Sequence, residues 1–174
     1  FATGFLALGA IFGCLIAGKL ADKWGRRPGL MSAAALFALS FLAMAFSPTR
    51  DFFIVARFAA GIGVGMASML SPMYIAEISP AHLRGRMVAV NQLTIVLGIL
   101  ITNLINYTLR DNGDASWRWM FGLGVIPAGL FLAGAAILPE SPRWLVKDGK
   151  HDKASAVLQK IGDGTFVHDT LRDI

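Results

Sequence analysis

The sequence predicts an all-α membrane protein with five spanning helices, and three observations support this prediction. Hydrophobic residues make up 55% of the 174 residues and charged residues 16%, against about 45–50% and about 25% in soluble domains. The apolar residues form runs of the length that a helix needs to cross a bilayer, about 20 residues. These runs also lack the polar face that a soluble core helix repeats every third or fourth position.

The apolar runs give the order of the elements. Only one of them contains a charged residue, Arg57. Charge, proline or a turn bounds each run, and glycine or proline inside a span is tolerated when neighbouring helices satisfy the freed backbone groups. A secretory signal followed by a soluble domain would explain only the first run. We therefore expect spans at about 1–18, 29–47, 52–76, 87–109 and 118–138.

The remaining residues, 139–174, are expected to form a cytoplasmic linker with a short amphipathic helix. Ala154, Val157, Leu158 and Ile161 recur at helical spacing, which gives one apolar stripe. This helix would either lie on the membrane face or cap the cytoplasmic ends of the spans.

Basic residues alternate between the loops. The segments 18–29, 77–86 and 139–174 carry twelve lysines and arginines, and the other two loops carry three. The positive-inside rule places those three segments in the cytoplasm, with the amino-terminal end outside. The alternation also argues against nucleic acid as the partner of this basic chain.

No residue pattern indicates an enzyme, a metal site or a cofactor. Cys14 is the only cysteine, so a disulfide within the chain is excluded, and the three histidines lack ligand spacing. Gly61, Gly63 and Gly65 miss the G-x-G-x-x-G spacing of a nucleotide loop and lie inside a span. The G-x-x-x-G pairs at 9–13 and 61–65 instead predict close helix contact.

The first basic loop reads GKLADKWGRRP over residues 18–28. Its two glycines allow a tight turn, the carboxylate of Asp22 is expected near a helix N-terminus, and the arginines stay in water. This spacing resembles the signature of the major facilitator superfamily between its helices two and three, G-x-x-x-D-R/K-x-G-R-R/K.

Two further segments resemble the sugar porter family of this superfamily. Residues 74–86 read YIAEISPAHLRGR, like the loop between helices four and five with its R-G-R/K ending. Residues 139–145 read PESPRWL, the family's signature at the cytoplasmic end of helix six and the most specific of the three motifs. The chain is most similar to bacterial sugar porters of the xylose–proton symporter kind.

The resemblance implies that the five spans are helices two to six of the amino-terminal half of a major facilitator fold. Helix one and the carboxy-terminal half would then be missing partners. The chain also begins without an initiator methionine, so we expect a truncated sequence with five spans as a lower bound. The bacterial inner membrane is the expected location.

The resemblance also implies a cytoplasmic gate, an ion-pair network that holds the two halves together when the carrier faces outward. Exposed ion pairs contribute at most about 1 kcal/mol each, but several together can bias two states separated by a few kcal/mol. The alternative is that these charges only orient the protein. The residues are Asp22, Arg26, Arg27, Glu77, Arg84, Glu140 and Arg143.

The span 87–109 is unusually polar. At about 100° per residue, Gln92, Asn103 and Asn106 share one face with Ile99. Amides donate and accept hydrogen bonds, as sugar hydroxyls do, and facing lipid would be costly, so this face should point inward. Interhelical hydrogen bonding, worth about 0.6 kcal/mol per contact, is the alternative.

By resemblance, Gln92 matches a glutamine that contacts sugar, and Ile99 occupies a position that varies between glutamine and isoleucine. The expected substrate-binding residues are therefore Gln92, Ile99 and Asn103. A second stripe on the same span, Asn91 with Gly98 and Thr102, is expected to be a packing seam.

Arg57 lies six residues into its span, where burying an arginine costs about 2.5–3.5 kcal/mol on insertion scales. It would either reach the outer surface or serve proton coupling. In proton-coupled relatives an arginine here faces an aspartate of helix one, and a nearby cation favours the charged carboxylate.

The resemblance therefore implies secondary active transport of a monosaccharide, a pentose or hexose, by alternating access and proton symport. The partners would be the sugar, a proton and the lipid bilayer, with no cofactor. Two alternatives stay open, a facilitative sugar uniporter and a membrane sugar sensor that does not transport. A carrier of organic acids or drugs is disfavoured by the 139–145 signature and the amide-rich face.

Overall fold

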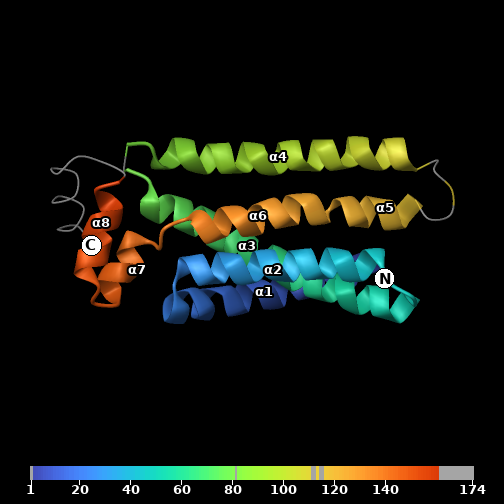
Figure 1. The fold of residues 1–174 in the computed structure, drawn as a ribbon, viewed down its shortest axis with the longest axis horizontal. Helices are drawn as coiled ribbons and strands as arrows, with labels where there is room; N and C mark the ends of the chain where they lie inside the picture. The colour runs from blue at the N-terminus through green and yellow to red at the C-terminus, as the bar shows by residue number, and fades with distance from the viewer. Residues whose placement is uncertain (1, 81, 111–112, 114–115, 161–174) are drawn as a thin grey trace.

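The computed structural model describes residues 2–80, 82–110, 113 and 116–160. This part of the chain is helical and contains no strand (Figure 1). Ile161 of the predicted stripe, His168 and Arg172 lie outside the described residues. The helices are α1 (Ala2–Trp24), α2 (Arg26–Ala45), α3 (Arg50–Ile78), α4 (Arg84–Leu109), α5 (Ser116–Leu123), α6 (Val125–Ile137), α7 (Pro142–Lys147) and α8 (His151–Leu158).

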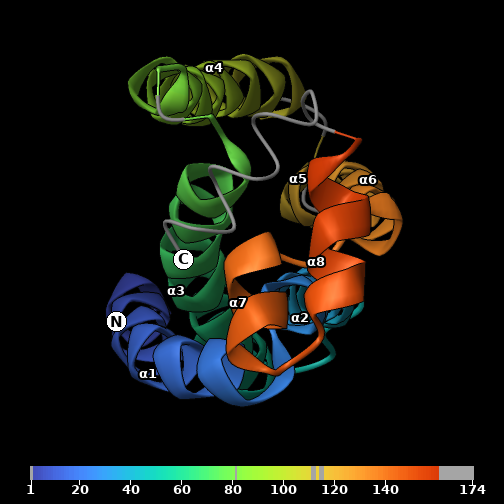
Figure 2. The same ribbon diagram turned by 90° about the vertical axis from the view of Figure 1, so that its left-hand side faces the viewer.

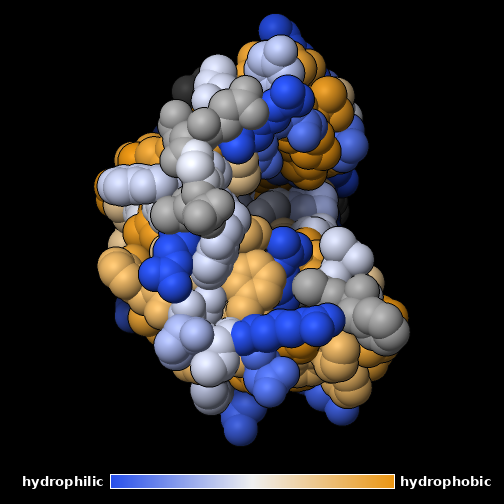
Figure 3. Space-filling view, turned by 90° about the vertical axis from the view of Figure 1, so that its right-hand side faces the viewer, coloured by the Kyte–Doolittle hydropathy of each residue, from blue (hydrophilic) through white to orange (hydrophobic). Residues whose placement is uncertain are grey.

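Five helical segments are long and apolar enough to cross a membrane: α1, α2, α3, α4, and α5 with α6 together. They run along the long axis of the molecule, while α7 and α8 lie across one end (Figures 1 and 2). Seen from the other end, hydrophobic side chains cover the sides of the bundle and hydrophilic ones gather over the end face (Figure 3). This distribution suits a bilayer around the long helices.

Glycines bring α1 and α3 into direct backbone contact. A Cβ atom on Gly9 would overlap the carbonyl oxygen of Phe58, and one on Gly65 would overlap that of Ala10. Gly13 and Gly61 face carbonyl oxygens across the same interface. The close helix contact predicted from the two G-x-x-x-G pairs is therefore confirmed.

Helix α3 is the centre of the bundle because it packs on both α1 and α2. Thr49 caps its start by accepting a hydrogen bond from the backbone N–H of Phe52. Leu70 and Tyr74 of α3 are buried against Leu30 of α2 and Ala135 of α6. Small residues dominate this core, as close helix packing in membranes requires.

The fifth predicted span is one continuous run in the sequence but two helices in the structure, with the break at Gly124. Pro127 explains the break, because it has no N–H to donate and its ring would clash with the carbonyl of Leu123, four residues earlier. Gly124 fits the break, since a Cβ there would crowd the ring of Phe41. The predicted span at about 118–138 is present as Ser116–Ile137, and it consists of two helices, α5 and α6, in line.

Helix α4 stands apart from the bundle. It contains no buried residue, and its main contacts are with α3 and α5. Figures 1 and 2 show it along one edge of the molecule. Most of its surface is therefore available to groups that do not belong to the described helices.

Gly65→Ala and Gly134→Ala should change stability in opposite directions. An alanine adds about 1 kcal/mol of helix preference over glycine, and at Gly134 the added methyl group meets nothing within 4 Å. At Gly65 the same methyl group must push α1 from α3. Thermal unfolding of the purified protein in detergent should show a lower midpoint for Gly65→Ala and an equal or higher one for Gly134→Ala. Equal shifts in the same direction would contradict close α1–α3 packing.

Candidate functional site

The three motifs converge on one cluster at the end of the bundle where α1 turns into α2. Arg26 of α2 and Glu77 of α3 form a fork at its centre. Nε of Arg26 donates to both carboxylate oxygens of Glu77, at 3.1 and 3.0 Å, and Nη2 donates to one of them at 2.9 Å. Each side chain is only 11% exposed. This is a buried, bidentate ion pair, the geometry for which arginine is best suited.

Glu140 caps the N-terminus of α2 from a position far along the chain. Its carboxylate accepts hydrogen bonds from the backbone N–H groups of Arg26 at 2.8 Å, Arg27 at 3.1 Å and Ser141 at 2.8 Å. A negative charge is favourable there because the first N–H groups of a helix have no intrahelical acceptor. Gly25 makes room, since its φ is +103° and a Cβ would overlap the carboxylate.

The hydrogen bonds at the start of α2 go to Glu140, whereas Asp22, expected near a helix N-terminus, makes side-chain contacts. Asp22 belongs to the last turn of α1, and its side chain is 62% exposed. Its carboxylate lies 3.6 Å from Nη1 of Arg26 and 3.5 Å from Nζ of Lys147. The exposed position gives these two contacts little energy.

The side chains of Ser141, Tyr74 and Trp144 complete the cluster. None of them was among the site residues predicted from the sequence. Ser141 is fully buried, donates to Glu77 and caps α7 by accepting from the N–H of Trp144. The hydroxyl of Tyr74 donates to the carbonyl of Pro139 at 2.9 Å, and Nε1 of Trp144 donates to that of Asp22 at 3.2 Å. A serine directly before a proline is a helix-start signal that could have identified the Ser141 cap.

Arg27 joins the cluster through its backbone, and its Nη2 donates to the carbonyl oxygen of Ala136 at the end of α6. Five of the seven predicted gate residues are thus brought together: Asp22, Arg26, Arg27, Glu77 and Glu140.

Arg84 and Arg143 lie outside this cluster. Nε of Arg84 is buried without a hydrogen-bond partner, and Arg143 is exposed. Within the described residues, neither side chain makes a hydrogen bond or an ion pair. Both remain free to bind groups beyond these helices.

The amide-bearing helix α4 divides its polar residues between two faces. Asn106 lines a cavity of about 520 Å³ between α4 and helices α2, α5 and α6, together with Gly98 and Thr102. Gln92, Ile99 and Asn103 are exposed and do not line this cavity. The structure therefore groups Asn106 with the predicted packing seam and leaves the other three on an open face.

Arg57 lies over two aromatic rings that also contact each other. Its guanidinium carbon is 4.9 Å from the ring centre of Phe121 and 5.3 Å from that of Phe53. Its Nε is buried and has no hydrogen-bond partner among the described residues. The rings hold the cation in place by cation–π attraction but leave its hydrogen-bonding capacity unused.

No group of three or more histidine, cysteine, aspartate or glutamate side chains in the described part of the chain could hold a metal ion.

Known proteins resemble the chain over nearly its whole length. Residues 1–174 match the family described as "Sugar (and other) transporter". The D-xylose-proton symporter of Escherichia coli is 40% identical over 98% of the chain and 40% of its own length. The arabinose-proton symporter of Bacillus subtilis is 38% identical over 97% of the chain and 38% of its own length. The chain spans less than half the length of these relatives.

A solved structure gives the same picture for the fold. The major facilitator proton:xylose symporter XylE of Escherichia coli, bound to 6-bromo-6-deoxy-D-glucose, superposes with a TM-score of 0.94 at 37% identity. The superposition covers 99% of this chain and 42% of that one. The predicted major facilitator fold is thus confirmed, and the numbering of the spans as helices two to six stays a prediction. The chain belongs to the sugar transporter family.

Proposed function

We propose that this chain is part of a secondary transporter that carries a monosaccharide across a membrane by alternating access, with proton symport. The likeness of 99% of the chain to a proton:xylose symporter, at a TM-score of 0.94, carries the proposal. The sugar is a pentose or hexose, and the membrane is the bacterial inner membrane. The end of the bundle with α7 and α8 would face the cytoplasm, because it holds the basic segments.

The open face of α4 supports a sugar site. Gln92 and Asn103 project amides from a helix that crosses the membrane and are exposed within this chain. Amides facing hydrocarbon would be costly, so this face needs polar partners, as a sugar and a water-filled cavity would provide. Ile99 lies between the two and would contribute an apolar contact.

Gln92→Ala in the complete protein should weaken sugar binding by about tenfold, the loss of one or two hydrogen bonds. Asn91→Ala is the matched control, since Asn91 lies next to Gln92 in the sequence but on the other stripe. Isothermal titration of the purified protein with a panel of pentoses and hexoses measures both. Equal affinity of wild type and Gln92→Ala for every bound sugar would refute the contact.

Arg57 is the proposed proton-coupling residue because its guanidinium lies over the rings of Phe53 and Phe121 with Nε unsatisfied. A buried cation in a membrane span is costly without a partner. A carboxylate on a preceding helix would satisfy it, and gain or loss of a proton by that carboxylate would change the attraction between them.

Arg57→Leu should abolish proton-driven sugar accumulation while sugar binding persists. Arg50→Leu is the control, because Arg50 is exposed at the start of the same helix. Uptake into proteoliposomes with and without a pH gradient separates accumulation from downhill flux. Gradient-driven accumulation by Arg57→Leu would exclude the coupling role, and wild-type uptake that ignores the gradient would indicate the uniporter instead.

The proposed gate has two parts: one holds the helices of this chain together, and the other contacts the other half of the transporter. Arg26, Glu77 and Glu140 satisfy one another and the start of α2, so they hold these helices together. Arg84 and Arg143 have no partners among the described residues and are free to contact the other half of the transporter.

Glu77→Gln and Arg143→Gln should therefore have different consequences. Removing one partner of a buried pair costs about 3–5 kcal/mol, so Glu77→Gln should unfold more easily in detergent. Arg143→Gln should leave unfolding unchanged and shift the ratio of outward-facing to inward-facing protein by up to about fivefold, the effect of an exposed ion pair. Distances between spin labels on the two halves measure that ratio. Destabilisation by both variants alike would contradict the division.

A further inference from the structure

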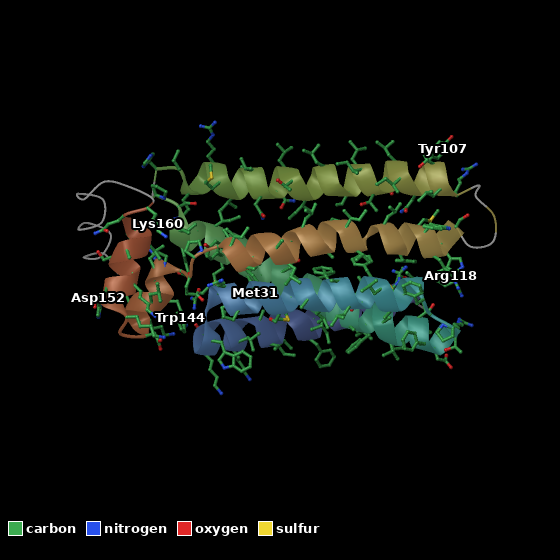
Figure 4. The ribbon with its side chains drawn as sticks, in the orientation of Figure 1. Met31, Tyr107, Arg118, Trp144, Asp152 and Lys160 are labelled. Atoms are coloured by element: carbon green, nitrogen blue, oxygen red, sulfur yellow. The ribbon has the colours of Figure 1, made fainter. Side chains whose placement is uncertain are left out.

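We propose that the cavity between α2 and helices α7 and α8 binds the phosphate headgroup of an anionic phospholipid. Arg27 and Glu140 of the cluster described above line this cavity of about 580 Å³, together with Lys150 and Lys153, which have no role in the gate. Figure 4 shows Met31, one of its lining residues, on α2 and Trp144, another, on α7 at the same end of the bundle.

Three cations surround the cavity. Arg27 comes from the first turn of α2, and Lys150 and Lys153 come from the start of α8. Nε of Arg27 is buried without a hydrogen-bond partner among the described residues. The Lys150 ammonium lies over the ring of Trp144 and pairs with Asp148 at the surface, where such a pair is easily exchanged. A phosphate group would satisfy all three cations.

Glu140 is the one acidic residue in the lining. Its carboxylate already accepts backbone hydrogen bonds at the start of α2 and from Ser141. The positive end of the helix dipole offsets its charge. The charged side chains in the lining are therefore three cations and one carboxylate whose hydrogen bonds are already made.

The apolar part of the lining favours a lipid over a free phosphate ion. Met31, Leu145 and Val157 are among the apolar residues that line the cavity. Nearby, at the end of α6, Ile137 is 85% exposed, so an apolar surface continues along the span. An anionic phospholipid matches both kinds of lining residue, because its headgroup would lie among the cations and its acyl chains along the apolar surface. A lysine or arginine near the membrane surface attracts anionic lipid by about 1 kcal/mol.

The test measures lipid bound to the protein purified in detergent by native mass spectrometry, during titration with phosphatidylglycerol or phosphatidylcholine. The wild type should bind phosphatidylglycerol more tightly. The double variant Lys150→Gln/Lys153→Gln should bind it about 25-fold more weakly, since each lysine is worth about fivefold. Lys160→Gln removes the same kind of charge from the end of α8, outside the cavity, and should bind like the wild type (Figure 4).

Three results would overturn the proposal. Equal binding of the two lipids by the wild type would remove the headgroup preference. Equal losses in the double variant and in Lys160→Gln would indicate general attraction to a basic surface. Competition by inorganic phosphate at the concentration of the lipid would identify a phosphate ion site instead. None of these outcomes depends on transport, so the test is independent of the proposed function.

Discussion

The placement of one carboxylate, that of Glu140, determines how this end of the molecule is built. The first N–H groups of α2 need an acceptor. Only Gly25 separates the end of α1 from the start of α2, and glycine has no side chain that could cap the helix. Glu140 supplies that acceptor from a position 114 residues from Arg26, and so fixes the end of α6 against the start of α2. The hairpin of α1 and α2 and the segment leading into α7 are thereby joined without a disulfide or a metal.

The buried fork of Arg26 and Glu77 follows from the same placement. Burying two charges costs several kcal/mol per ion unless the geometry is good and further hydrogen bonds satisfy the remaining atoms. Here Arg26 also donates to the carbonyl of Ala21, and Glu77 also accepts from Ser141, which Glu140 positions through the neighbouring peptide. Ser141 in turn starts α7, and α7 carries α8 to the side of α2. The cationic cavity therefore depends on the hydrogen bonds of Glu77 and Glu140, because these bonds position Ser141 and the helices α7 and α8 that follow it.

Local features of the sequence were enough to predict the membrane helices and the tight α1–α3 contact, since hydrophobic length and glycine spacing act within a few turns. The cap at α2 was not predictable in this way. The sequence offers Asp22 close by and Glu140 far away, and only the packing of α6 on α2 decides between them. Helical spacing groups Asn106 with Gln92 and Asn103, whereas in the structure Asn106 lines a cavity with Gly98 and Thr102. Its place depends on how α4 leans toward α5, which no periodicity encodes.

The groups that stay unsatisfied are as informative as those that pair. A buried polar atom without a partner costs about 1–3 kcal/mol, more for a charged group, and such atoms are few in native proteins. In the described residues the buried atoms of this kind are Nε of Arg27, Arg57 and Arg84. They lie at three separate places: beside the α2–α8 cavity, over the aromatic rings of Phe53 and Phe121, and at the start of α4. The same helices satisfy every nitrogen of the Arg26 guanidinium. The three unsatisfied Nε atoms therefore mark the surfaces where a lipid, a coupling carboxylate and the other half of a transporter would supply the missing acceptors.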